Sequence, residues 1–415
     1  MSPETGTQRQ GNREMTKRCS WLAAVLAVTV MPTLAMAETV KVGVVMTYSG
    51  GGAQFAQQIE RAMDLYMKRD GRAKLGEHEI ELIKRDARNP AGDAAKTAVQ
   101  ELIVREDIDL LTGFIYSPNI IASAPLIDQA KVPTLVLNAA TAWIPSLSPY
   151  IARVSMTMWQ TGYPMGGYAV EELGCETAAV GYTDYPPGKD SLEAFRMGFE
   201  QAGGELIDEI PMGGPAEVPD FTPFMQRVKD AAPDCFFVFV PSGNHVAAVF
   251  KTYADLGMRE AGVRLIGPGD LTQDTELQGM GEDAVGVVTL GQYQADLDVG
   301  TNAEFVAAWH EAYGADSTPD FMAAAGYDGM AAIVDAIVQQ DGRIDPDRTM
   351  EIWAGWTHDG PRGTVMIDPE TRDIVQDMKV NEVYAEDGRL KMRTIDMIPQ
   401  VKDPCKEQKV GRCAE

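Results

Sequence analysis

The stretch VKVGVVMTYSGGGAQFAQQIERAMDLYM, residues 40–67, indicates the architecture of the chain. It opens with a short apolar run that predicts a buried strand, and a glycine-containing turn follows at 48–52. Apolar residues at Ile59 and Met63 then recur at helical spacing, which predicts a helix that extends to about Lys68. A strand, a turn and a helix in this order form the unit of a parallel sheet that is covered by helices.

The same alternation runs through most of the chain. Further strands are predicted at 79–84, 110–114 and 134–137, and helices at 91–105 and 119–130. A second series predicts helices at 158–173, 191–202, 221–231 and 244–256, and strands at 178–182, 205–210, 235–240, 263–266 and 285–289. The remainder predicts helices at 301–313, 320–340 and 349–354, and strands near 363–367, 378–384 and 390–397, which we expect to complete the two sheets already begun.

The predicted fold class is therefore α/β, with two doubly wound parallel-sheet lobes. The first lobe is expected at 38–155 plus 292–352, the second at 156–291 plus 353–400, and a tail at 401–415. The chain then crosses between the lobes more than once, which predicts a hinge of several strands.

An export signal is predicted at residues 1–37. Three basic residues lie between positions 13 and 18, an apolar run follows at 21–31, and Ala35-Met36-Ala37 has the small-x-small pattern of a signal peptidase site. Residues 1–14 are unusually polar for such a signal, so Met15 is an alternative start of translation.

An uncleaved anchor helix is the alternative to a cleaved signal. The apolar run has only about half of the ~20 residues that span a bilayer. Cys19 precedes this run and does not stand at the cleavage point, so a lipid anchor is not expected. We expect the mature protein in the periplasm of a Gram-negative bacterium, with no membrane insertion after cleavage.

The composition restricts the possible partners. The 415 residues include 36 basic and 61 acidic side chains, which give a formal net charge of −25. Such a surface repels the phosphates of nucleic acids and anionic lipids, so neither is an expected partner. The length fits two domains, and a monomer is expected.

The cysteines indicate disulfide bonds, and the histidines do not indicate a metal site. In an oxidising compartment, Cys405 could pair with Cys413, and Cys175 could pair with Cys235 at the starts of adjacent strands. The pairing stays open at this stage. The four histidines are scattered without an HExxH pattern, so no metal site or cofactor is expected.

Ligands of open α/β sheets bind beyond the carboxyl ends of the strands, so the loops that follow the strands contain the candidate site residues. Four of these loop residues offer hydroxyl groups: Ser49, Ser117, Thr141 and Ser242. Four others could wall in an apolar or aromatic ligand: Phe55, Tyr116, Trp143 and Tyr185. Asp270 could bind an ammonium group or accept a hydrogen bond from a hydroxyl.

Each of these residues also has a purely structural explanation. Ser117, Thr141 and Ser242 could equally be helix N-caps, and a loop aromatic is often part of the core or its rim. The glycine run in the first loop matches neither a Walker A nor a GxGxxG pattern. The prediction of a binding site depends on the shared character of all the loops.

Several segments resemble a known family. They are residues 40–67 quoted above, KRDARNPAGDAAKTAVQELIVREDIDLLTG (84–113), SAPLIDQAKVPTLVLNAATAWIPSLSPYIARV (123–154), PDCFFVFVPSGN (233–244), VRLIGPGDL (263–271) and GPRGTVMIDPETRDIVQDMKVNEV (360–383). In order and in pattern they resemble the leucine/isoleucine/valine-binding family of type I periplasmic binding proteins, over essentially the whole mature chain.

The resemblance implies a Venus flytrap of two lobes joined by three crossovers, which delivers its ligand to the permease and ATPase of an ABC transporter. It also implies that Ser117, Ala139 and Thr141 hold the ligand's carboxylate, with Phe55 and Tyr185 as aromatic contacts. At the site for the amino group, Asp270 lies one position later than the acidic residue of the family.

The expected function is thus capture of a small carboxylate-bearing solute, with a branched-chain or other apolar amino acid ranked first. An aromatic or other organic acid, or an amide, is the alternative ligand, and a ligand sensor is an alternative function. A secreted enzyme is a remote alternative because no GxSxG or SxxK motif is present, and no catalytic residue is assigned.

Overall fold

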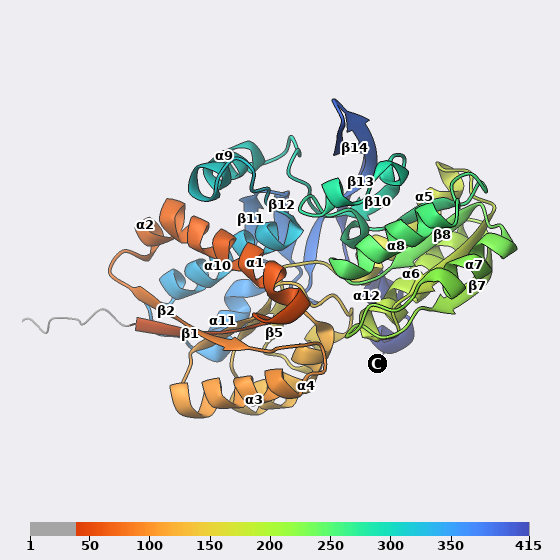
Figure 1. The fold of residues 1–415 in the computed structure, drawn as a ribbon. Coiled ribbons are helices and arrows are strands. Elements are labelled where there is room, and N and C mark those ends of the chain that lie inside the picture. Colours follow the sequence, from red (N-terminus) through yellow and green to blue (C-terminus); the bar gives the residue numbers. More distant parts are fainter. Residues whose placement is uncertain (1–38, 415) are drawn as a thin grey trace, which may run out of the picture. The chain divides into compact units, whose positions relative to one another are not determined.

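A computed structural model describes residues 39–414, and the predicted signal at 1–37 lies outside this part. The described residues form two sheets, shown in Figure 1. The first sheet has the order β2-β1-β3-β4-β5, and all its strand pairs are parallel. Its strands are β1 (Thr39–Met46), β2 (Glu79–Asp86), β3 (Leu110–Gly113), β4 (Thr134–Val136) and β5 (Ile151–Arg153).

The second sheet has nine strands in the order β11-β12-β13-β10-β9-β8-β6-β7, with β14 also paired to β13. They are β6 (Thr177–Tyr182), β7 (Glu205–Pro211), β8 (Cys235–Phe239), β9 (Arg264–Pro268), β10 (Val288–Gly291), β11 (Thr357–Gly360), β12 (Gly363–Ile367), β13 (Ile374–Glu386) and β14 (Arg389–Val401). The strands from β6 to β10 run parallel, and β11 to β14 pair in antiparallel fashion.

The α-helices connect and cover these strands. They are α1 (Ala53–Tyr66), α2 (Arg72–Leu75), α3 (Asp93–Glu101), α4 (Ser117–Ala130), α5 (Met158–Glu171), α6 (Pro186–Gln201), α7 (Thr222–Ala231), α8 (Asn244–Asp255), α9 (Asn302–Tyr313), α10 (Phe321–Gln339), α11 (Pro346–Trp353) and α12 (Pro404–Gln408).

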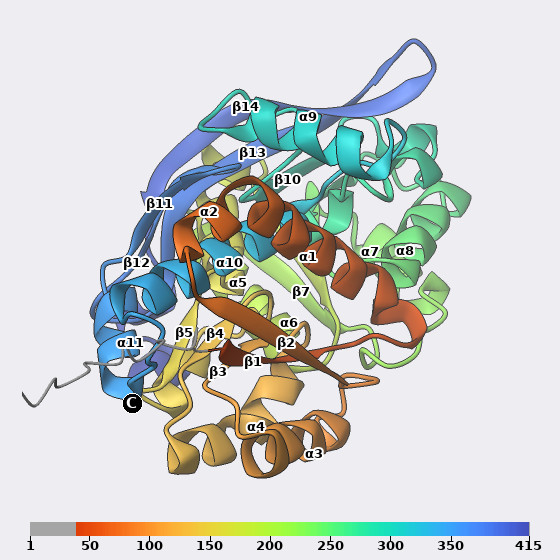
Figure 2. The ribbon, with the colours of Figure 1, turned by 90° about the vertical axis from the view of Figure 1, so that its left-hand side faces the viewer.

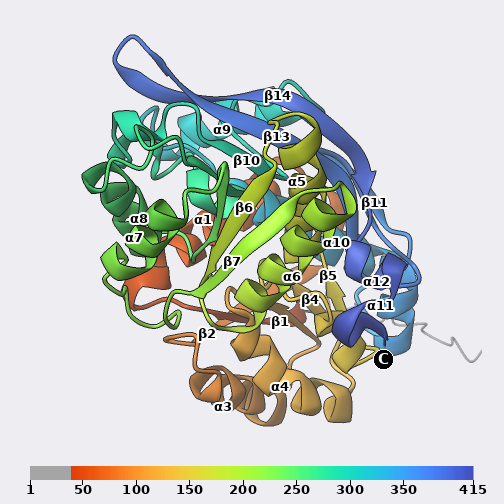
Figure 3. The ribbon, with the colours of Figure 1, turned by 90° about the vertical axis from the view of Figure 1, so that its right-hand side faces the viewer.

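Side chains of a strand alternate between the two faces of its sheet, so a strand covered on both faces is apolar throughout. In β1, Val42 and Val44 pack toward α1 and α10, whereas Val45 packs toward α3 and α4. Figure 2 shows these two pairs of helices on opposite sides of the first sheet. In β8, Phe237 packs toward α5 and α6 and Phe236 toward α7 and α8, and Figure 3 shows the corresponding layers.

The structure corrects several details of the prediction. The C-terminal strands complete only the second sheet, because β13 pairs with β10 and the hairpin of β13 and β14 folds back on itself. Helix α6 starts at Pro186, five residues earlier than expected, because proline suits the first turn of a helix. The three-residue strand β5 was missed because it is too short to show a period.

One helix in the described part of the chain, α10, is long and apolar enough by length and composition to cross a membrane. However, 89% of its apolar window is buried inside the protein. It packs along α1, where Gly326 lies so close that an added Cβ would be 2.5 Å from the carbonyl oxygen of Ile59. In this structure α10 is a core helix.

Two disulfides are present among residues 39–414. Cys175 and Cys235 join the start of β6 to the start of β8, its parallel neighbour. Cys405 and Cys413 close a short loop in the C-terminal tail. The long-range bond ties the second sheet together, whereas the short one shapes only the tail.

Helices α5 and α6 approach each other through glycines, which leads to a testable prediction. A Cβ added at Gly198 would lie 2.0 Å from the carbonyl oxygen of Tyr163, whereas one added at Gly167 would meet nothing within 4 Å. We expect Gly198→Ala to lower the free energy of unfolding by about 3 kcal/mol because the two backbones must move apart. Gly167→Ala should leave stability unchanged or raise it by up to ~1 kcal/mol, since alanine favours helix. Urea unfolding checks both, and equal effects of the two substitutions would contradict the prediction.

Candidate ligand-binding site

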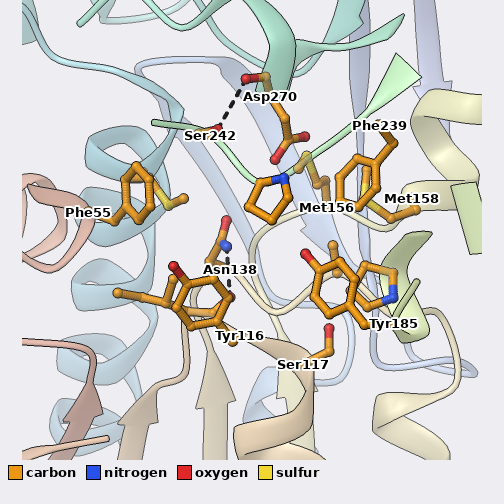
Figure 4. Close-up of a pocket in the computed structure, with 15 residues that line it drawn as sticks. Phe55, Tyr116, Ser117, Asn138, Met156, Met158, Tyr185, Phe239, Ser242 and Asp270 are labelled. Atoms are coloured by element: carbon orange, nitrogen blue, oxygen red, sulfur yellow. Dashed lines mark hydrogen bonds between the residues drawn. The ribbon is translucent and has the colours of Figure 1, made fainter. Parts of the chain in front are cut away.

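A cavity lies where the carboxyl ends of strands from both sheets meet (Figure 4). Its wall is mainly apolar and includes four aromatic rings and three methionines. The lining residues are Phe55, Ile115, Tyr116, Ser117, Asn138, Ala140, Met156, Met158, Tyr185, Pro187, Phe239, Pro241, Ser242, Asp270 and Met322.

The side contributed by the first sheet presents neutral hydrogen-bonding groups. Ser117 is the first residue of α4, where backbone N–H groups lack partners inside the helix and favour an anion. Its Oγ accepts a hydrogen bond from the backbone N–H of Thr141, at 3.2 Å. Asn138 is held in place because its Nδ2 donates to the carbonyl of Ile115, at 2.9 Å. This end of the cavity can therefore bind a carboxylate without a cationic side chain.

The loop behind this end is fixed by a buried arginine. The guanidinium of Arg153 donates to the carbonyl oxygens of Ala139 (2.7 Å), Thr141 (2.9 Å) and Ala142 (3.1 Å). It also donates to Asp373, at 2.8 Å from Nε, and both side chains are almost fully buried. The C=O and N–H of a trans peptide point in opposite directions. When Arg153 binds a carbonyl oxygen, the N–H of the same peptide group therefore points away from Arg153.

The side contributed by the second sheet contains Asp270, the one charged side chain among the described residues that line the cavity. Asp270 is 8% exposed, and its Oδ2 has no hydrogen-bond partner among the described residues. The hydroxyl of Ser242 donates to the backbone carbonyl of Asp270, at 3.1 Å, and not to its carboxylate. Burial raises the pKa of Asp270 to about 7, and the nearby charge of Glu276 adds to this rise.

Two tyrosines contribute hydroxyl groups to a mainly apolar wall. The ring of Tyr185 stacks on Phe239, with centroids 6.1 Å apart and planes inclined by 15°. Burial raises the pKa of Tyr116 to about 12, and that of Tyr185 well above its ordinary value. Both hydroxyls therefore stay protonated and can donate to a ligand at neutral pH.

Six of the predicted site residues line the cavity: Phe55, Tyr116, Ser117, Tyr185, Ser242 and Asp270. Four others do not. Ser49 is exposed and interacts with Asp86. Trp143 faces the C-terminal tail, where the guanidinium of Arg412 lies 4.7 Å from its ring centroid.

Ala139 and Thr141 lie behind the wall. The N–H of Ala139 donates to Phe114 and its carbonyl accepts from Arg153, so neither group is free for a ligand. Thr141 is fully buried, and its Oγ1 has no partner among the described residues. Ala140, between them, lines the cavity in their place.

Ser117, Thr141 and Ser242 are not helix N-caps in this structure. The N-cap of α4 is Tyr116 and that of α8 is Gly243, and neither cap shows a side-chain hydrogen bond. Thr141 does not cap the helical segment that follows it, because the N-cap of that segment is Trp143.

The sequence analysis missed several lining residues. Met156 lies between β5 and α5, Met158 is the first residue of α5, and Met322 comes from the start of α10. Phe239 is the last residue of β8, and Asn138 follows β4 by two residues. The positions of Phe239 and Asn138 at strand ends are a signal that could have identified them.

Among the hydrogen bonds that join elements built around different sheets, one lies at Gln54 and another at Ala142. Nε2 of Gln54 in α1 donates to Oε1 of Glu276 at 3.0 Å, and Glu276 also accepts from the N–H of Gly243. The N–H of Ala142 donates to Asp190 in α6 at 2.7 Å. Burial raises the pKa of Asp190 to about 7. Within residues 39–414, no three His, Cys, Asp or Glu side chains come together in a way that could hold a metal ion.

Two α/β sheets with an apolar cavity at their carboxyl ends define a protein that binds a small molecule. A family model described as periplasmic binding protein matches residues 39–389. The chain belongs to this family of periplasmic binding proteins, and both the resemblance to its leucine/isoleucine/valine-binding members and the predicted fold class are confirmed. It is a solute-binding protein of the kind that serves ABC transporters.

The proteins that are similar to this chain differ in the ligands that their names give. The chain is 36% identical over 384 residues to a Leu/Ile/Val-binding protein homolog 6 of Brucella melitensis, a match that covers 92% of this chain and 97% of the other. It is 40% identical to an ABC-transporter solute-binding protein of Rhodopseudomonas palustris in complex with 3,4-dihydroxybenzoic acid, with a TM-score of 0.83 and coverage of 89% and 99%. A second R. palustris solute-binding protein, in complex with 4-hydroxybenzoate, is 35% identical, with a TM-score of 0.84 and coverage of 88% and 99%.

Proposed function

We propose that this protein captures an aromatic carboxylic acid and delivers it to an ABC importer. The observation that carries the proposal is the cavity wall, in which four aromatic rings and three methionines surround neutral donors at one end. Flat apolar walls bury an aromatic ring, and the Oγ–H of Ser117 with the N-terminus of α4 binds a carboxylate. The aromatic acids bound by the two R. palustris proteins support this assignment.

A branched-chain amino acid is the second candidate. It is favoured by the name of the Brucella relative and by the buried carboxylate of Asp270, which could pair with an ammonium group. An α-amino acid carries both charges on one carbon, however, whereas Ser117 and Asp270 come from opposite sides of the cavity in Figure 4. An aromatic ring spans two such groups better than a single carbon does.

Capture follows a shift of population between open and closed forms of the two predicted lobes, 38–155 plus 292–352 and 156–291 plus 353–400. The hydrogen bonds from Gln54 to Glu276 and from Ala142 to Asp190 would form on closure and stabilise the closed form. Residues 1–37 direct export and are removed, so that the periplasmic protein starts at Glu38. The intact mass of protein isolated from the periplasm tests this cleavage.

A thermal-shift panel on protein stripped of bound ligand tests the proposed ligand class. Benzoate, 4-hydroxybenzoate and 3,4-dihydroxybenzoate would be compared with leucine and phenylalanine. A ligand at 100 times its Kd stabilises the native state by about 2.7 kcal/mol, so aromatic acids should raise the Tm clearly and leucine should not. A shift by leucine without any shift by an aromatic acid would overturn the proposal.

A pair of serine variants then tests the carboxylate end. Ser117→Ala should weaken binding of the aromatic acid by about 10- to 100-fold, because a hydrogen bond to a charged group is lost. Ser146→Ala, at an exposed position outside the cavity, is the matched control and should bind like the wild type. Calorimetric titration measures both Kd values, and an unchanged Kd in Ser117→Ala would exclude Ser117 from the carboxylate site.

A further inference from the structure

The carboxylate of Asp270 points into the cavity in Figure 4, at the end away from Ser117. Asp270 belongs to the turn Gly269–Thr272 that follows β9, and its side chain is more than nine-tenths buried. Oδ2 has no hydrogen-bond partner among the described residues. A buried acceptor without a donor is costly, so native structures rarely keep one without a reason.

The surroundings of Asp270 do not supply the missing donor. No cationic side chain of the described part of the chain lines the cavity, and the charged neighbour that acts on Asp270 is another acid, Glu276. Ser242 donates to the backbone carbonyl of Asp270, and the hydroxyl of Tyr185, in the same wall, makes no hydrogen bond to Oδ2. A molecule in the cavity can supply the donor for Oδ2.

We propose that Asp270 selects aromatic acids that carry a hydrogen-bond donor, such as a phenolic hydroxyl, on the side of the ring opposite the carboxylate. The proposal rests on the function proposed above and adds the determinant of specificity within that cavity. A hydroxyl there donates to Oδ2 of Asp270, whereas an acid with hydrogen or methoxy at that position leaves Oδ2 without a donor. A site with a buried polar group rejects ligands that cannot pair with it far more strongly than an apolar site rejects a small difference in size.

Three ligands of similar shape test the proposal on the wild-type protein. We expect 4-hydroxybenzoate to bind about 100-fold more tightly than benzoate or 4-methoxybenzoate, as measured by calorimetry. Similar Kd values for 4-hydroxybenzoate and benzoate would overturn the role of Asp270 and leave the aromatic-acid function intact. Failure of all three ligands to bind, together with binding of leucine, would overturn the proposed function itself.

A variant pair assigns the preference to Asp270. Asp270→Leu should reduce the preference for 4-hydroxybenzoate over benzoate from about 100-fold to less than about 10-fold, because the apolar side chain needs no donor. Ser117→Ala should weaken both ligands by the same factor and keep the preference, because it acts at the carboxylate end. Circular dichroism would check the fold of Asp270→Leu, and Asp270→Ala, which also lacks a side-chain acceptor, serves if that variant does not fold. A preference that persists unchanged in the folded Asp270 variant would contradict the proposal.

Discussion

Replacing Arg153 with methionine is expected to lower the free energy of unfolding by about 3–5 kcal/mol, because it breaks a fully buried ion pair. The side chains of Arg153 and Asp373 are 0% and 1% exposed. Without the guanidinium, Asp373 keeps Lys406 as its cationic partner but loses two hydrogen bonds. The carbonyl oxygens of Ala139, Thr141 and Ala142 lose their donor at the same time.

The same substitution should weaken ligand binding by more than tenfold. The loop that Arg153 holds includes Ala140, which lines the cavity, and Thr141, whose N–H donates to Ser117. If that loop moves, the donors for the ligand's carboxylate are no longer held in position before binding, and ordering them then opposes binding. Arg153 is thus a positioning residue that never contacts the cavity.

Urea unfolding and calorimetric titration with 4-hydroxybenzoate measure these two effects of Arg153→Met. The matched control is Arg196→Met, which removes an arginine from a half-exposed pair with Glu209. Exposed pairs contribute about 0–1 kcal/mol, so this control should unfold and bind nearly like the wild type. A stability of Arg153→Met within 1 kcal/mol of the wild type, or an unchanged Kd, would show that the loop is held by other contacts.

The parts of the fold that repeat a local pattern could be predicted from the sequence. The apolar run at 40–46 and the helical spacing after it give β1 and α1, because both periods are read over several residues. The pairing of β13 with β10 could not be predicted in this way, since it joins residues about 90 positions apart. A local pattern indicates that a strand exists, but it does not indicate which other strand pairs with it.

The same distinction applies to the candidate site, where residues near strand ends could be predicted and residues brought in by distant contacts could not. Tyr116, Ser117 and Asp270 lie within four residues of a strand end, so the rule for carboxyl ends places them at the cavity. Met322 lines it because α10 returns to α1 from a distant part of the chain, which no local spacing indicates. Trp143 is not among the lining residues, and its ring lies against Arg412 of the C-terminal tail, a contact that no local spacing indicates.

Removing the disulfide between Cys175 and Cys235 is expected to lower the free energy of unfolding by about 4 kcal/mol. The bond closes a loop with a sequence separation of 60 residues, so it restricts the unfolded chain strongly. Both cysteines are buried, and the double variant Cys175→Ala/Cys235→Ala keeps small apolar side chains there. β6 and β8 stay paired in the folded state, so the loss arises mainly in the unfolded state.

The second disulfide provides the matched control for this prediction. Cys405 and Cys413 are separated by 8 residues, for which the same loop-entropy relation gives about 2.5 kcal/mol at most. This value is an upper limit because the tail can detach without unfolding of the two sheets. Urea unfolding of both double variants, and of the wild type with and without reductant, would measure the difference. Loop entropy grows with loop length, so the tail variant should lose less stability than the Cys175 and Cys235 variant. A larger loss of stability in the tail variant would show that the disulfides act through the native state instead of the unfolded chain.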